Sequence, residues 1–145
     1  MDARSSLARG LLLASLLIIP GALIAQDEPE IVPEWKLVGQ VGTVRTVYVS
    51  PDGLRDKYFV AQVLQAVVAK TDPARTVQVM LFDNPRFTPE GLPMTHAQML
   101  HLKAQYDRNP KAKHERFVWV SVVDRNSSPP KLKETEARIR PGVAE

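Results

Sequence analysis

Apolar residues gather in short segments that polar residues separate, and three of these segments are dense in β-branched and aromatic side chains. They are residues 43–49 (TVRTVYV), 76–83 (TVQVMLFD) and 115–123 (ERFVWVSVV), and each predicts a β-strand. A weaker strand is expected over residues 35–41, where Gly39 interrupts the pattern. The second and third of the strong strands are apolar on both faces, which is typical of strands inside a sheet that is covered on both sides.

Apolar residues recur at helical spacing in two further segments. Asp56 is the expected N-cap of a helix that runs from Lys57 to about Lys70. Its apolar side is formed by Val60, Val63, Leu64 and Val67. Thr95 is the expected cap of a second helix, which runs to about Asp107 and carries an apolar stripe on each of two sides. A two-sided apolar helix is more often sandwiched between partners than free.

These elements follow one another in the order (β)-β-α-β-α-β, which predicts a small single α/β domain. Helices between strands imply right-handed crossovers, so we expect a three- or four-stranded, at least partly parallel sheet with two packed helices. The compact domain is expected over residues 35–124. Residues 125–145 are rich in proline and charge, and we expect them to form a tail that is extended over the surface or disordered.

The N-terminal residues 1–25 have the three-part pattern of a signal peptide. Two arginines precede an apolar run over residues 11–19, and residues 22–25 offer a cleavage site. The uncharged run is short for a membrane span, so we expect cleavage and export to the periplasm or the medium. Contact with a membrane would come only from this segment, if it stays uncleaved. Residues 26–34 are then an extended leader that contains two prolines.

Composition narrows the chemistry that this sequence can perform. It has no cysteine, which excludes disulfides, thiolate metal sites and a cysteine nucleophile within these 145 residues. Its seven glycines form no glycine-rich phosphate loop. A net charge of +3 is mildly basic and falls short of the concentrated basic patch of a nucleic-acid binder. We therefore do not expect a nucleic acid as a partner.

The candidates for catalysis lie where the strands end, because open α/β sheets bind ligands beyond the C-terminal ends of parallel strands. Asp83 follows one strand, and Ser50 and Asp52 follow the preceding one. Two carboxylates at this edge could hold a divalent cation or act as acid and base. Turn formation explains the same residues, because Asp-Asn-Pro and Pro-Asp-Gly side chains bond to local backbone N–H groups.

The histidines do not form a recognisable metal site. His96 and His101 are five positions apart, whereas pairs that bind one metal ion from a helix face are about three or four apart. His114 lies in a polar loop. We therefore expect no metal ion and no cofactor, and His96 stays a candidate catalytic residue beside Asp83 and Asp52.

Candidate binding residues are cationic or aromatic. Tyr106 and Arg108 could stack on and pair with an anionic ligand, and Arg86 is a further candidate in the loop after the second strong strand. Cations at the end of a helix account for the same basic segment without any ligand. An apolar face could pair with a second copy or with another envelope protein. It is formed by Met99, Leu102 and Tyr106.

Three functions are compatible with these features. The leading hypothesis is an exported, non-catalytic binding or scaffold protein of the cell envelope. The first alternative is a small hydrolase or metal-dependent enzyme with Asp52 and Asp83 at its site, joined by Glu90 or His96, and with residues 84–94 as its lid. The second alternative is an envelope protein that binds an anionic polymer through its mildly basic surface, with an affinity that falls steeply as salt rises.

Overall fold

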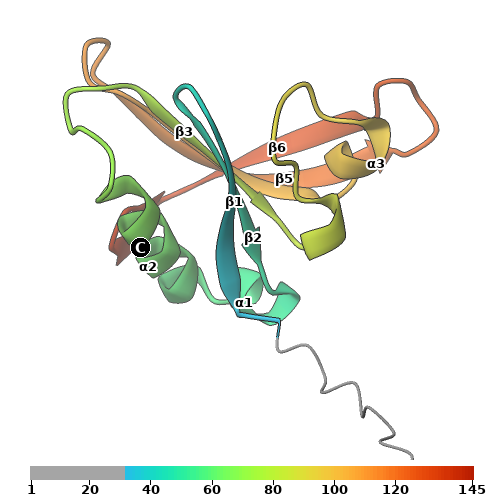
Figure 1. Cartoon of the computed structure of the whole chain (residues 1–145), viewed down its shortest axis with the longest axis horizontal. Helices are drawn as coiled ribbons and strands as arrows, with labels where there is room; N and C mark the ends of the chain where they lie inside the picture. Colours follow the sequence, from blue (N-terminus) through green and yellow to red (C-terminus); the bar gives the residue numbers. More distant parts are fainter. Residues whose placement is uncertain (1–31) are drawn as a thin grey trace, which may run out of the picture. The chain divides into compact units, whose positions relative to one another are not determined.

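A computed structural model describes residues 32–145, which form one six-stranded mixed sheet with helices on its flanks (Figure 1). The strands lie side by side in sequence order. They are β1 (Trp35–Val41), β2 (Val44–Val49), β3 (Val77–Phe82), β4 (Leu102–Asn109), β5 (His114–Asp124) and β6 (Lys131–Ala137). Only β2 and β3 are parallel, and every other neighbouring pair is antiparallel. The expected signal peptide and most of the expected leader lie outside the described residues.

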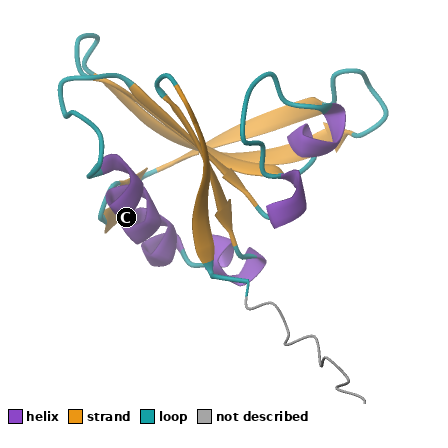
Figure 2. Cartoon of the chain, viewed as in Figure 1, coloured by secondary structure: helices purple, strands orange, loops and turns teal. Residues whose placement is uncertain are grey.

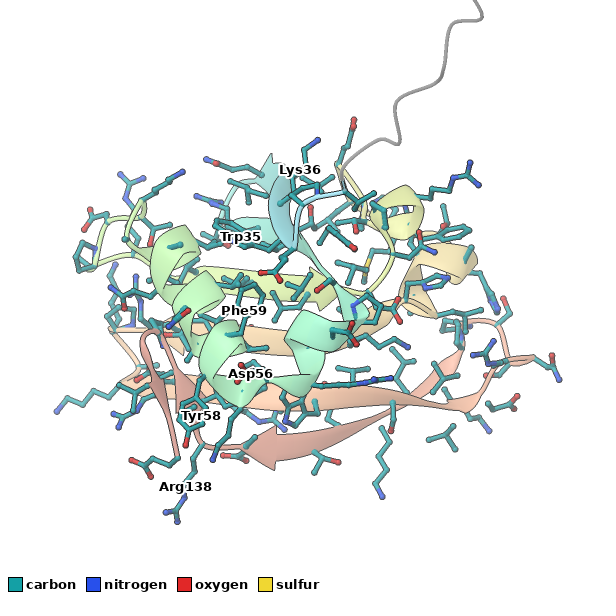
Figure 3. The ribbon with its side chains drawn as sticks, turned by 90° about the horizontal axis from the view of Figure 1, so that it is seen from below. Trp35, Lys36, Asp56, Tyr58, Phe59 and Arg138 are labelled. Atoms are coloured by element: carbon teal, nitrogen blue, oxygen red, sulfur yellow. The ribbon has the colours of Figure 1, made fainter. Side chains whose placement is uncertain are left out.

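The helices are short. They are α1 (Pro51–Arg55), α2 (Lys57–Val68), the single 3₁₀ turn η1 (Pro85–Phe87) and α3 (His96–Met99). The Asp56 side chain accepts hydrogen bonds from the backbone N–H groups of Tyr58 and Phe59 at 2.9 and 3.3 Å, which confirms it as the N-cap of α2. Figure 3 shows these three residues together at the start of α2. In the described part of the chain, no helix is long and apolar enough to cross a membrane.

The predicted α/β fold with two packed helices is wrong, because the molecule is mostly β. The strands over residues 35–41, 44–49, 77–82 and 114–124 and the helix over residues 57–68 were expected. The second helix was not a helix beyond its first turn: α3 ends at Met99, and β4 begins at Leu102. With β4, and with β6 from the segment expected to be a tail, the sheet has six strands instead of three or four.

The error over residues 102–109 has a physical cause in the spacing of the apolar residues. Ala104 and Tyr106 are buried, while Gln105 between them and Asp107 after them are half-buried, which is the two-residue alternation of a strand. Positions four apart share a face in a strand as well as in a helix. Apolar residues that alternate along a strand therefore fall on two sides when the same segment is drawn as a helix. Pairing with β3 and β5 makes the segment a strand.

The C-terminal segment is part of the folded structure. β6 pairs with β5, and two short strands, β7 (Ile139–Arg140) and β8 (Val143–Ala144), form a separate ribbon. Ile139 is buried in the core, and the Gly142 N–H donates to the Ala61 carbonyl of α2 at 2.8 Å. The chain end consequently lies beside α2 (Figure 1). On β6, Glu134 and Glu136 pair with Arg116 of β5 at 3.1 and 3.7 Å.

Each face of the sheet has its own apolar core. The core under α2 includes the large buried side chains Leu81, Tyr106 and Phe117, which come from β3, β4 and β5. The core of the opposite face includes Met80, Phe82, Leu102, Val118 and Val120. Met94, from the loop that carries η1 and α3, packs against this second core. Figure 2 shows α2 and this loop on opposite sides of the sheet.

The loop over residues 83–101, which we call the second-face loop, is held against the sheet where it passes over β1 and β2. The Thr46 hydroxyl donates to the Pro89 carbonyl, and Thr46 is buried. Gly39 lies at a bulge of β1, and a Cβ there would come within 2.6 Å of the Glu90 carbonyl oxygen and 2.5 Å of Thr46 Oγ1. Only glycine leaves room for the loop at this point, which explains why glycine interrupts the strand pattern.

We predict that Gly39→Ala lowers the free energy of unfolding by about 1–3 kcal/mol, because the added methyl group collides with backbone that is held in place. Gly91→Ala is the matched control in the same loop, since a Cβ at Gly91 would meet nothing within 4 Å. Urea denaturation of both variants measures the difference. An equal effect at the two glycines would show that the loop does not press on β1.

Candidate functional site

The parallel pair places the ends of β2 and β3 next to each other, since Tyr48 and Phe82 are register partners. Ser50 and Asp52 follow β2, as the sequence suggested, but they serve α1. The Ser50 Oγ accepts a hydrogen bond from the Gly53 N–H at 3.0 Å and caps the helix. The Asp52 side chain is 94% exposed and pairs with Arg55 at 3.4 Å. Asp52 therefore faces solvent, and its ion pair is with Arg55.

Asp83 sits in a cluster of three charged or ionisable side chains. Its Oδ1 is 2.7 Å from His101 Nδ1, and its Oδ2 is 3.6 Å from Lys103 Nζ. The Asp83 N–H also donates to the His101 carbonyl at 3.2 Å. All three side chains are largely buried, with exposed fractions of 25–30%. The cluster joins the end of β3 to the start of β4.

Packing fixes the imidazole of His101 as well. The Phe87 ring, from η1, stacks on it with a centroid distance of 4.6 Å and an interplanar angle of 6°. A carboxylate on Nδ1 of an oriented imidazole is the arrangement that supports a general base. A hydrolase of the triad type also needs a side-chain nucleophile on the other ring nitrogen. Within residues 32–145, the hydrogen bonds of the His101 side chain involve Asp83 and no hydroxyl group.

A cleft of about 260 Å³ adjoins this cluster. Its walls come from α1, from the end of β3, and from β4 and β5. It is lined by Pro51, Leu54, Arg55, Asp83, Lys103, Trp119 and Val120. Apolar side chains make up much of the lining, and Asp83 with Lys103 forms a charged wall whose charges are already paired.

The remaining catalytic candidates lie apart from the cluster. His96, at the start of α3, places its Nε2 3.0 Å from the Arg125 carbonyl oxygen. Glu90 and His114 are exposed, the first in the second-face loop and the second at the start of β5. Among the residues that the structure places, no three His, Cys, Asp or Glu side chains are grouped so that they could hold a metal ion.

Tyr106 is buried in the core, so its ring does not reach a ligand at the surface. Its hydroxyl donates to Glu115 Oε1 at 2.8 Å. Burial raises the pKa of the Tyr106 hydroxyl strongly, and the hydrogen bond to Glu115 raises it further. Leu102 is also buried, and it faces the opposite core. Of the apolar face expected around Met99, Leu102 and Tyr106 are therefore buried in the two cores of the sheet.

The two arginine candidates have different surroundings. Arg86, in η1, is exposed, and its N–H donates to the Asn84 side chain at 3.0 Å. Arg108, near the end of β4, is half-buried, and its Nη2 lies 3.4 Å from both Thr71 Oγ1 and the Asp72 carbonyl oxygen. Arg108 thus contacts the connection between α2 and β3.

Sequence reasoning missed the pairing of Asp83 with His101. The two residues are 18 positions apart, and they meet only because β4 returns antiparallel to β3. With residues 95–107 taken as a helix, His101 was compared with His96 instead. A strand pattern over residues 102–109 would have been the signal that brings His101 to the end of β3.

Searches with profiles of known protein families, against characterised proteins and against solved structures found no match to this chain.

We predict that Asp83→Ala lowers the free energy of unfolding by about 1–3 kcal/mol, because it leaves His101 and Lys103 half-buried without their carboxylate. Asp52→Ala is the control, since its exposed pair with Arg55 contributes little. Its effect should stay within about 0.5 kcal/mol. Chemical denaturation at neutral pH compares the two. A loss at Asp83 no larger than at Asp52 would contradict a structural cluster.

A second prediction concerns alkaline pH. The unfolded chain ionises Tyr106 near the ordinary pKa of 10.0, whereas the folded chain keeps it neutral, so stability is lost as pH rises above 10.0. Tyr106→Phe removes this loss, which amounts to about 1.4 kcal/mol at about pH 11. Denaturant titrations of both proteins at about pH 9 and pH 11 measure it. Equal falls in the two proteins would show that Tyr106 is not held neutral.

Proposed function

We propose that this protein is an exported binding domain that performs no chemistry of its own, with the cleft beside Asp83 and Trp119 as its binding site. The observation that carries the proposal is the state of the polar groups around the cleft. Asp83 is engaged by His101 and Lys103, and Arg55 is paired with Asp52. Groups that already neutralise one another are suited to shaping a site and orienting a ligand.

The enzymatic alternative lacks support in the arrangement of its residues. Asp52 faces solvent, and the His96 ring contacts a backbone carbonyl near the β5–β6 connection. The loop proposed as a lid is fastened to the sheet by the bond between Thr46 and Pro89 and by its close approach to Gly39. These contacts hold the loop against the sheet, whereas a lid must move about a hinge.

The chemistry of the cleft favours a small apolar group. Leu54, Trp119 and Val120 supply apolar surface, and the neighbouring charges cancel in pairs. A volume of about 260 Å³ is below the range of drug-sized pockets, which begins at about 300 Å³. The cleft therefore suits one ring or one branched side chain, as presented by a peptide or a small ligand. Aromatic surface such as that of Trp119 is a frequent anchor in such contacts.

The test uses 4-methylphenol, an analogue of a tyrosine side chain, in an NMR titration of the full chain. The indole N–H resonance of Trp119 should shift, and that of Trp35 should not. Leu54→Lys should weaken binding about tenfold, because it places an unpaired charge in apolar surroundings. Leu92→Lys is the matched control, since Leu92 is 41% exposed in the second-face loop.

Two results would contradict the proposal. One is an equal shift of both indole resonances, which means binding without a defined site. The other is equal weakening by Leu54→Lys and Leu92→Lys, which means that the cleft is not where the ring binds.

A further inference from the structure

A second cavity lies at the opposite end of the parallel pair, where β2 and β3 begin. Its volume is about 380 Å³, and its walls are the turn between β1 and β2 and the connection from α2 to β3. It is lined by Gly42, Thr43, Arg45, Lys70, Thr71, Asp72, Arg75 and Thr76. We call it the basic pocket, because three of these side chains are cations and only one is an anion.

A fourth cation reaches the wall of the basic pocket from β4. The Nη2 of Arg108 lies 3.4 Å from the Thr71 hydroxyl and from the Asp72 carbonyl oxygen, and both residues line the pocket. The Nε of Arg108 is buried and has no hydrogen-bond partner in the part of the chain that the structure describes. A buried donor without a partner is uncommon in folded proteins and calls for an explanation.

Neutral groups hold Arg45 and Arg108 in place without cancelling their charge. The Nη1 of Arg45 donates to the carbonyls of Gly42 at 2.7 Å and of Val44 at 3.1 Å. For residues 32–145, no carboxylate lies within 4.0 Å of the charged groups of Arg45, Lys70 or Arg108. Among the described residues, no ion pair therefore cancels the positive charge of these three side chains.

The one carboxylate of the pocket is engaged locally. Asp72 Oδ1 accepts a hydrogen bond from the Ala74 N–H at 2.9 Å, and Oδ2 lies 3.7 Å from Arg75 Nε. Asp72 thus offsets about one of the four cations. The negative end of the α2 dipole explains a lysine at position 70. It does not explain Arg45 and Arg108, which come from strands.

We propose that the basic pocket binds an oxyanion of the phosphate type, either free or as a unit of a longer chain. Three uncompensated cations match the charge of a phosphate or polyphosphate better than that of a single carboxylate. Guanidinium groups donate in forks that fit phosphate oxygens, and the hydroxyl groups of Thr43 and Thr76 supply further donors at the walls. The site is separate from the cleft at Trp119, and neither proposal depends on the other.

The experiment is a titration of the full chain with inorganic phosphate and, separately, with linear polyphosphate, followed by NMR and by calorimetry. Amide resonances of residues 42–45 and 70–76 should shift. Arg45→Gln should weaken binding roughly tenfold, because an uncompensated charge and its charge-assisted hydrogen bond are lost. Arg125→Gln is the control, because Arg125 is exposed, lies outside the pocket and pairs with no carboxylate among residues 32–145.

The two probes separate the two sources of the anion. Similar affinity for both means that the pocket takes a single phosphate group. Much tighter binding of polyphosphate, with a steep loss at higher salt, means that a polymer is the ligand. The proposal is overturned if neither probe shifts residues 42–45 and 70–76. It is equally overturned if Arg125→Gln weakens binding as much as Arg45→Gln.

Discussion

The parallel pairing of β2 with β3 is the constraint on which the rest of the molecule depends. Two parallel neighbours need a crossover, and α2 provides it and covers one face of the sheet. The same pairing places the C-terminal ends of the two strands side by side, and likewise their N-terminal ends. Each of these meetings leaves a cavity, and the cavities differ in chemistry because different connections close them. The antiparallel strands on either side widen the sheet without creating such a junction.

The opposite face of the sheet is covered by a loop instead of a helix, and this choice explains several polar contacts. A loop buries backbone groups that need partners. The Thr46 hydroxyl donates to the Pro89 carbonyl, and the Thr88 hydroxyl donates to the Asn84 carbonyl at 2.9 Å. The pairing of Asp83 with His101 then joins both ends of the loop. The cluster that resembles a catalytic dyad thus has a clear structural task, which is to hold the loop against the second core.

Local signals were sufficient for part of this structure. Asp56 caps α2 through its own neighbours, and the density of β-branched residues marks β2, β3 and β5 irrespective of what lies beside them. Pairing decides the rest. β4 has apolar positions that suit a helix as well as a strand, and only its register with β3 and β5 settles it. β6 (KLKETEA) has no apolar face and became a strand because β5 offers it hydrogen bonds.

The candidate sites follow the same division. Ser50 caps α1 through the Gly53 N–H, and Asp52 pairs with Arg55 three positions later, so the bonds of both residues are local although the segment is a short helix. The basic pocket could not be predicted from the sequence, because Arg45 and Arg108 come near Lys70 and Arg75 only after the sheet is assembled. A list of cations along the chain contains no information about which of them share a cavity.

The charges of β6 also affect how this protein behaves at high concentration. β6 is an outer strand, and consecutive side chains of a strand point to opposite faces, so Lys131 and Lys133 lie on one face and Glu134 and Glu136 on the other. Two copies that joined edge to edge about a two-fold axis would bring equal faces together. Registers of this antiparallel pairing that set Lys131 opposite Lys133, or Glu134 opposite Glu136, place like charges together and are disfavoured. β6, which lies in the segment expected to be extended or disordered, thus carries the kind of charged side chains that disfavour edge-to-edge pairing of sheets.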